Sequence, residues 1–148
     1  MSSSDSYDKL SIEGYAWPLS AAPGETIGLH VSTNADRYAI EIARVGAERE
    51  VVWTQDGFAG TRHPVPDNAS THGCQWPVAH ELVLPDHWRS GYYNVVIRGC
   101  NDGRTAVGQA FFVVRASHPG QEAKILMPFT ANTYNAYNTW GGSSLYRG

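Results

Sequence analysis

Short runs in which apolar and polar residues alternate occupy most of the chain between residues 11 and 116. Ile27, Leu29 and Val31 alternate with smaller or polar neighbours, and a similar alternation recurs in later runs. β-Branched and aromatic residues are frequent within these runs, which is typical of strands with one buried face. The pattern predicts about seven strands, near residues 11–17, 26–33, 37–45, 50–54, 78–84, 92–99 and 107–115.

Turn-forming residues separate the predicted strands. Pro23-Gly24 precedes the second strand, Ser90-Gly91 precedes the sixth, and Asn101-Asp102-Gly103 closes a predicted hairpin. No segment shows a sustained helical period. Seven short strands over about a hundred residues predict an all-β fold, an Ig-like or fibronectin-like antiparallel β-sandwich. Tyr92 and Tyr93, which follow Ser90-Gly91 directly, are placed as in a tyrosine corner.

One face of each predicted strand is expected to form a common core. The predicted core residues are Ile27, Leu29, Val31, Tyr38, Ile40, Ile42, Leu82, Val95, Ile97, Phe111 and Val113. Val78 and His80 are placed on the same face as Leu82.

The remaining segments differ from the sandwich in composition. Residues 1–10 are polar and serine-rich and are expected to be a disordered arm, so the sandwich is assigned to residues 11–118. Residues 119–148 form a non-sandwich tail, which we interpret as a linker and the truncated start of an α/β domain. Within it, Ala123–Phe129 is a short apolar run that predicts the strand opening such a domain. Residues 55–77 form a long loop rich in glycine and proline, and such loops are usually functional or packed against a neighbour.

Charge and hydropathy exclude several classes of partner. The formal net charge is −3 and basic residues are scattered singly, so the basic patch that nucleic-acid binding requires is not found. No apolar run approaches the roughly 18 residues of a membrane-spanning helix. The polar N-terminus has no apolar signal region, which favours a cytoplasmic location. In that reducing environment Cys74 and Cys100 are expected to remain thiols, because Cys74 lies far from the strand that would carry an Ig-type disulfide.

Four potential metal ligands are close in the sequence. They are His63, His72, Cys74 and His80. Their spacing matches no common zinc motif, and His80 is placed on the apolar face of a strand. The sequence therefore favours a satisfied, buried His80 and exposed loop residues over a zinc site.

The tail contains the densest aromatic cluster of the chain. Tyr134, Tyr137, Trp140 and Tyr146 alternate with asparagines, of which Asn138 lies within the cluster. Aromatic residues in this arrangement form either a packing surface or a platform for a planar or sugar ligand. Tyr134, Asn138, Trp140 and Tyr146 are the candidate binding residues.

The segment from Ala136 to Tyr146, with the pattern AYNxWGGxSLY, resembles part of the large (β) subunit of N,N-dimethylformamidase and its relatives. The Leu84-Pro85-x-x-Trp88-x-Ser90-Gly91-x-Tyr93 stretch is also similar to that family, so the resemblance extends over nearly the whole chain. It implies an internal Ig-like domain that leads into a C-terminal α/β domain of glutamine-amidotransferase-like shape. It also implies a mononuclear non-haem iron site of tyrosines and a glutamate that activates water to hydrolyse a formamide.

Matched to this family motif, Tyr137 is the single candidate iron ligand, with Tyr146 a weaker second. The other family ligands are not matched within the chain, and one phenol, with an ordinary pKa of about 10, does not hold iron alone. No cofactor is therefore expected for the chain by itself, and the resemblance does not imply that the chain is an active enzyme. Its expected partner is the missing α/β domain or a partner chain, and the tail could also mediate a homo-oligomer.

Two functions remain open from the sequence. The first is an accessory Ig-like domain of a formamidase-like amidohydrolase that is not catalytic alone. The alternative is a free-standing binding module that uses residues 55–77 and the aromatic tail to contact a protein or a carbohydrate.

Overall fold

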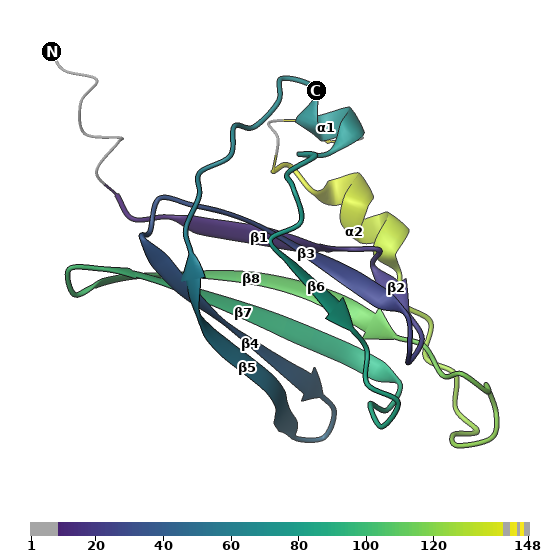
Figure 1. Ribbon diagram of the computed structural model, residues 1–148. Coiled ribbons are helices and arrows are strands. Elements are labelled where there is room, and N and C mark those ends of the chain that lie inside the picture. The colour runs from purple at the N-terminus through teal and green to yellow at the C-terminus, as the bar shows by residue number, and fades with distance from the viewer. Residues whose placement is uncertain (1–8, 141–142, 145, 147–148) are drawn as a thin grey trace, which may run out of the picture. The chain divides into compact units, whose positions relative to one another are not determined.

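The computed structural model of the chain describes residues 9–140, 143, 144 and 146 (Figure 1). The predicted disordered arm therefore lies almost wholly outside the described residues. Strands dominate the described part, and they are β1 (Ile12–Trp17), β2 (Ser20–Ala21), β3 (Thr26–Thr33), β4 (Arg37–Val45), β5 (Arg49–Ala59), β6 (His80–Val83), β7 (Gly91–Asn101) and β8 (Arg104–Val114). Two short helices, α1 (Ala69–His72) and α2 (Ala131–Tyr137), complete the assignment.

The strands form two sheets that face each other (Figure 1). One sheet has the order β1-β3-β6 and the other the order β2-β8-β7-β4-β5. All pairs are antiparallel except the two-residue β2, which pairs in parallel with the end of β8. This arrangement confirms the predicted all-β sandwich. β2 was not predicted, and β5 continues to Ala59, five residues beyond its predicted end.

The core lies between the two sheets and contains nearly all of the residues expected there. Ile27, Leu29, Ile40, Ile42, Val95 and Ile97 are almost completely buried and belong to one hydrophobic cluster. Each comes from a run with period-two alternation, so burial of one face per strand explains both the pattern and the register.

The prediction for β8 was wrong by one residue. Phe112 and Val114 are buried, whereas Phe111 and Val113 lie on the other face, where the Phe111 ring stacks on Tyr92. All four residues of this Phe-Phe-Val-Val run are apolar, so the sequence pattern does not show which face of the strand is buried. Upstream, the inner positions of β8 are small because β1 crosses close to them, and a Cβ added at Gly108 would lie 2.7 Å from the Ile12 carbonyl oxygen.

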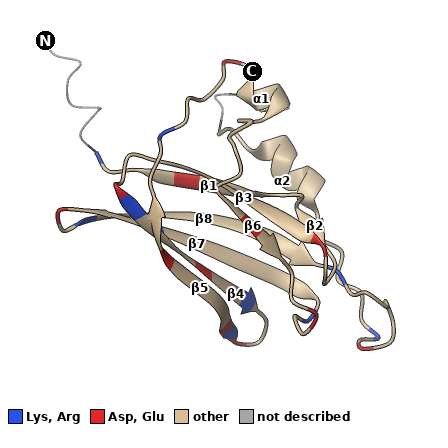
Figure 2. Cartoon of the chain, viewed as in Figure 1, with Lys and Arg blue, Asp and Glu red and all other residues tan. Residues whose placement is uncertain are grey.

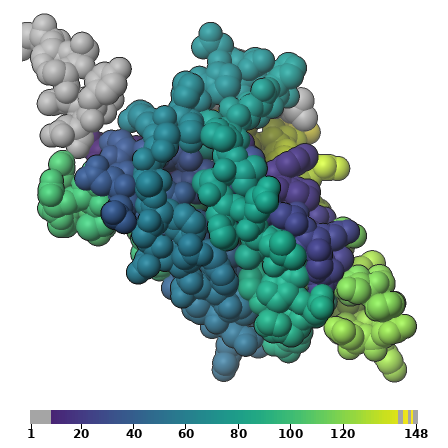
Figure 3. Space-filling model, in the orientation of Figure 1, coloured from purple at the N-terminus to yellow at the C-terminus, as the bar shows by residue number. Residues whose placement is uncertain are grey.

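The prediction for the strand that became β6 was wrong at its start. β6 begins at His80, and Val78 before it is half exposed rather than part of the core. His80 stacks on Trp53 of β5, with ring centroids 5.2 Å apart, and meets the Phe58 ring edge-on at 5.5 Å. These ring contacts join β5 and β6, which are edge strands of the two sheets. Figure 3 shows the segments with the colours of these two residue ranges side by side on one face. His80 therefore packs against aromatic rings as predicted, but it is only partly buried rather than buried.

A tyrosine corner fixes the entry to β7. The Tyr93 hydroxyl donates to the Arg89 carbonyl oxygen at 2.7 Å, as the sequence predicted for this pair of tyrosines. The Tyr93 ring lies between Trp88 and Phe112, with centroid separations of 5.1 and 5.4 Å. Burial raises the pKa of Tyr93 above its ordinary value, although Arg44 and Arg89 oppose this effect. The corner thus anchors the link between the sheets by a partly buried hydrogen bond and by ring packing.

Backbone contacts divide the chain into two compact units. The first contains the chain up to His63 together with Pro77–Ser117, and it holds both sheets. Acidic and basic residues both occur along its described strands and loops (Figure 2). The second contains Pro64–Trp76 and the chain from His118 onward. Residues 64–76 of the predicted long loop therefore group with the tail.

The second unit lacks the strand predicted near its start. Ala123–Phe129 adopts no regular structure, and the Ile125 and Leu126 side chains are each 88% exposed. A strand requires a neighbouring strand for its backbone hydrogen bonds, and the described residues of this unit provide none. The segment after it forms α2, a helix that the sequence pattern did not predict. Neither helix in the described residues is long and apolar enough to cross a membrane.

Candidate functional site

Helix α2 positions the first tyrosines of the tail. It begins after Thr130, and the Tyr134 N–H donates to the Thr130 carbonyl oxygen at 3.2 Å. Tyr137 is its last residue, because the backbone at Asn138 is extended. Tyr134 and Tyr137 are three residues apart on the helix and therefore lie on the same side of it.

Tyr137, the last residue of α2, lies against Tyr146. Their rings are stacked, with centroids 4.7 Å apart and planes inclined by 17°. The two side chains remain 63% and 67% exposed, so both phenol groups are accessible. The structure thus brings together the two tyrosines that the sequence proposed as metal ligands, across a segment whose Gly141, Gly142 and Leu145 lie outside the described residues.

Asn138 and Trp140 form the second half of the cluster. The Trp140 N–H donates to the Asn138 side-chain oxygen at 3.0 Å, which folds the backbone after α2 into a tight turn. Asn138 therefore shapes the motif through a local hydrogen bond. Whether Tyr134, Asn138, Trp140 and Tyr146 bind a ligand stays a prediction.

Sequence reasoning did not identify one member of the cluster. Trp76, at the end of the loop segment, meets the Trp140 ring edge-on, with centroids 5.9 Å apart and planes at 86°. Its indole N–H donates to the Pro64 carbonyl oxygen at 2.9 Å. The spacing of 64 residues between the tryptophans gives no sequence signal for their contact, apart from the unusual length of the loop.

The histidine and cysteine residues considered for zinc do not converge. His80 is held by the rings of β5, and the His72 ring accepts or donates a hydrogen bond with the neighbouring Thr71 hydroxyl at 2.7 Å. The backbone N–H of His63 donates a hydrogen bond to the Ser32 hydroxyl. Within the described part of the chain, no three His, Cys, Asp or Glu side chains gather to form a metal site, and neither cysteine forms a disulfide.

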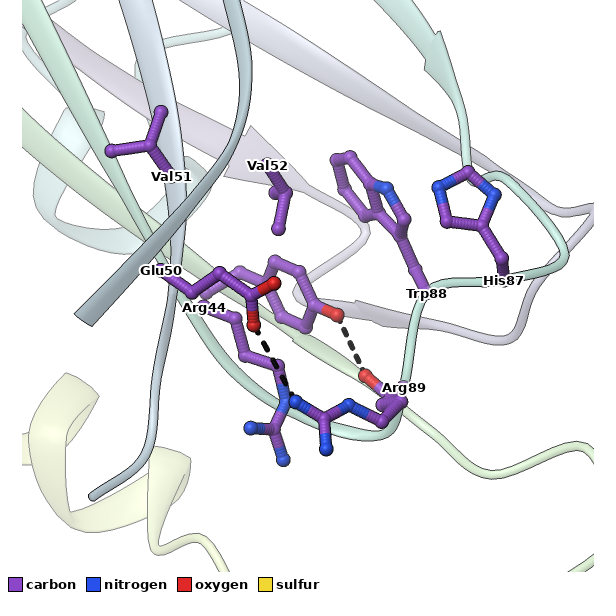
Figure 4. Close-up of a pocket in the computed structure, with 8 residues that line it drawn as sticks. Arg44, Glu50, Val51, Val52, His87, Trp88 and Arg89 are labelled. Carbon is purple, nitrogen blue, oxygen red and sulfur yellow. Dashed lines mark hydrogen bonds and ion pairs between the residues drawn. The ribbon is translucent and has the colours of Figure 1, made fainter. Parts of the chain in front are cut away.

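A cleft of about 280 Å³ lies elsewhere, on the sandwich (Figure 4). β4 and the start of β5 form one side of it, and the turn before β7 forms the other. Its lining residues are Arg44, Glu50, Val51, Val52, His87, Trp88, Arg89 and Tyr93.

The polar groups of the cleft mainly support the tyrosine corner. The Arg44 guanidinium donates two hydrogen bonds to the Ser90 carbonyl oxygen, at 3.0 and 3.3 Å. Arg89 and Glu50 form an ion pair at 3.4 Å, and both side chains are largely exposed (Figure 4). An exposed ion pair of this kind contributes little to stability. Arg44, Glu50 and Arg89 are thus already engaged in contacts with each other or with the turn before β7. The tail is therefore the stronger candidate site.

Comparison with models of protein families shows which family the chain belongs to. The model described as N,N-dimethylformamidase beta subunit-like, C-terminal, matches residues 39–148. The chain belongs to this family. The match covers most of the sandwich and the whole tyrosine motif, in agreement with the resemblance seen in the sequence. No curated protein matches the chain.

Membership of the dimethylformamidase-like family raises the question of whether the described residues fit a non-haem iron ion. Tyr137 and Tyr146 supply phenol oxygens, which are hard donors suited to Fe(III) when deprotonated. However, the described residues do not gather acidic or histidine side chains into a ligand group. The exposed and mutually stacked phenols are thus at most part of a ligand set, and the described residues do not fit a complete iron site.

Proposed function

We propose that this chain supplies the accessory β-sandwich of a formamide-hydrolysing enzyme, together with the first part of its α/β domain, and that it is not catalytic alone. The observation that carries the proposal is the pairing of Tyr137 with Tyr146 inside the segment that the dimethylformamidase-like family model matches. Exposed and adjacent phenols at the end of a helix are suited to join ligands from another part of an enzyme.

In the complete enzyme, a bound iron ion would supply an activated water for hydrolysis of the formamide C–N bond. The contribution of this chain is to hold its phenol groups in place. Tyr137 is the proposed ligand and Tyr146 the weaker second candidate. Tyr134, Asn138 and Trp140 would shape the surroundings of the site. The sandwich would provide a stable base that does not touch the substrate.

The tail also provides the proposed contact with the rest of the enzyme. Ile125, Leu126 and Met127 are all highly exposed in an apolar run. Removing each such side chain from water stabilises an association by about 1.5–3 kcal/mol. We propose that an α/β domain, or a partner chain that provides one, covers this run. Self-association through the same run is the competing outcome.

One observation favours the alternative function, a free-standing binding module. Trp76 of the loop contacts Trp140 of the tail, so the two segments proposed as a joint binding surface do touch. A protein or carbohydrate ligand would then contact the exposed rings of Tyr134, Tyr137 and Tyr146. Aromatic faces of this kind are common contact surfaces for both ligand classes.

The reading frame downstream of Gly148 separates the two functions. The enzyme proposal expects it to continue into an α/β pattern, and the protein made from the extended frame should hydrolyse N,N-dimethylformamide while this chain alone does not. Tyr137→Phe should abolish that activity, and Tyr134→Phe, a matched change one helical turn away, should largely retain it. Hydrolysis by this chain alone, or an extended protein unaffected by Tyr137→Phe, would refute the proposal.

A further inference from the structure

The cleft on the sandwich has an apolar side and a charged side (Figure 4). Trp88 is a buried member of the hydrophobic core, and Val52 is partly buried and packs against that core. In the figure, the Arg44, Glu50 and Arg89 side chains lie together below these apolar groups. The volume of about 280 Å³ is close to the lower end of ligand pockets, so the cleft is suited to a small molecule with one charged and one apolar end.

The charged side of the cleft carries one positive charge that is not compensated. Arg44 and Arg89 each contribute a guanidinium, and Glu50 contributes the one carboxylate among the described residues that line the cleft. Burial is the main cause of the raised pKa of Tyr93, while Arg44 and Arg89 lower this pKa and Glu50 raises it. All three charges are therefore close to the Tyr93 hydroxyl, and an anion placed among them is attracted by the excess positive charge.

Both guanidinium groups keep N–H donors for a ligand. Arg44 uses its Nε and Nη2 atoms on the Ser90 carbonyl oxygen, and its remaining N–H groups have no acceptor among the described residues. The bond from Arg89 to Glu50 is 3.4 Å long, whereas charge-assisted bonds between nitrogen and oxygen are usually about 2.7–2.9 Å. These two side chains are 66% and 63% exposed, so their pairing contributes little to stability. The carboxylate of a ligand can therefore replace Glu50 on Arg89 at small cost.

We infer that the cleft binds a small monocarboxylate that carries an apolar or aromatic group. The ligand carboxylate accepts hydrogen bonds from Arg44 and Arg89, because the planar guanidinium matches the two oxygens of a carboxylate. The apolar group of the ligand lies against Val51, Val52 and the Trp88 ring. A monoanion matches the single excess charge of the cleft, whereas a phosphate group carries a charge of about −1.5 to −2 at pH 7. The site lies wholly within the sandwich unit and is independent of the proposed function.

NMR titration of the ¹⁵N-labelled chain with benzoate tests the site. The backbone amides of residues 50–52 and 87–91 should shift saturably, with a millimolar dissociation constant. Benzamide, the neutral analogue, should bind at least about tenfold more weakly, because it loses the hydrogen bonds of a charged acceptor. Acetate, which lacks the ring, and phenyl phosphate, which keeps it, should both bind more weakly than benzoate. No saturable shift with benzoate, equal binding of benzamide or phenyl phosphate, or shifts confined to residues 130–140 would overturn the inference.

Substitutions at the exposed ion pair test the role of the charges. Arg89→Gln keeps the backbone carbonyl that accepts the Tyr93 hydrogen bond, and it should weaken benzoate binding about tenfold. Arg115→Gln is the matched control, because Arg115 forms a similarly exposed ion pair with Glu25, and it should change the affinity by less than about twofold. Glu50→Gln removes the competing carboxylate and should tighten binding by about two- to fivefold.

The amides of β4 and β7 report whether each variant stays folded. If Arg89→Gln disturbs the sandwich, Glu50→Gln and the comparison of benzoate with benzamide decide the question. An unchanged affinity in a folded Arg89→Gln protein, an equal loss in Arg115→Gln, or weaker binding in Glu50→Gln would overturn the inference.

Discussion

Adding one methyl group at Gly108 probes how closely the two sheets approach each other. Alanine in place of a strand glycine usually stabilises a protein by about 0.4–1 kcal/mol when the site has space, because it restricts the unfolded chain. At Gly108 the new Cβ would lie 2.7 Å from the Ile12 carbonyl oxygen and 3.2 Å from the Ile12 carbonyl carbon. Both atoms belong to the backbone of β1 and cannot move without disturbing the pairing of β1 with β3.

We therefore expect Gly108→Ala to destabilise the sandwich by about 1–3 kcal/mol, the usual cost of overpacking. Urea unfolding followed by tryptophan fluorescence measures the difference, and with an m-value of about 2 kcal/mol/M the midpoint should fall by about 0.5–1.5 M. Gly46→Ala is the control, because the nearest atom to its Cβ is the end of the flexible Arg44 side chain, and it should change stability by less than about 0.5 kcal/mol. A Gly108→Ala protein as stable as the parent would refute the close packing of β1 on β8.

Three further predictions concern the core, the corner and the tail. Ile40→Ala or Ile97→Ala should lower the free energy of unfolding by about 2–5 kcal/mol in the same urea assay, since both side chains are almost fully buried, and a loss below 1 kcal/mol would contradict the assigned core. Because burial raises the pKa of Tyr93, the neutral phenol should contribute its full stability to the sandwich below about pH 10, and this contribution should be lost as the pH rises further. Tyr93→Phe should therefore weaken the loss of folding stability at alkaline pH, as measured by unfolding at a series of pH values, and an unchanged profile would contradict the prediction. Deleting residues 118–148 should shift the melting temperature of the sandwich by less than about 4 °C, the effect of roughly 1 kcal/mol, and should reduce self-association in analytical ultracentrifugation; a large destabilisation would instead favour the binding-module alternative.

The sandwich could be predicted where each strand has one unambiguous apolar face. Ile27, Leu29 and Val31 alternate with smaller or polar residues, so their burial follows from the pattern. Phe111 to Val114 are all apolar, and the prediction selected the wrong pair. The signal that identifies the inner face is the row of small residues Ala106, Gly108 and Ala110, whose meaning depends on the crossing strand β1 and is invisible without it.

The tail shows a different limit. The tyrosine motif could be recognised because its residue types are rare and closely spaced, and Tyr137 and Tyr146 do lie together. The contact between Trp76 and Trp140 could not be predicted, because it joins residues far apart in the chain through packing and not through a repeated pattern. The apolar run Ala123–Phe129 suggested a strand, but hydropathy reports only the tendency to be buried and not whether a partner strand is present.

Iron content tests the central claim most directly. The claim is that Tyr137 is one ligand of an iron site that this chain does not complete. Metal analysis of the purified chain should find no stoichiometric iron, whereas the protein made from the extended reading frame should contain about one iron per chain, lost in Tyr137→Phe and retained in Tyr134→Phe. One tightly bound iron in this chain alone, or an extended protein that keeps its iron in Tyr137→Phe, would contradict the claim.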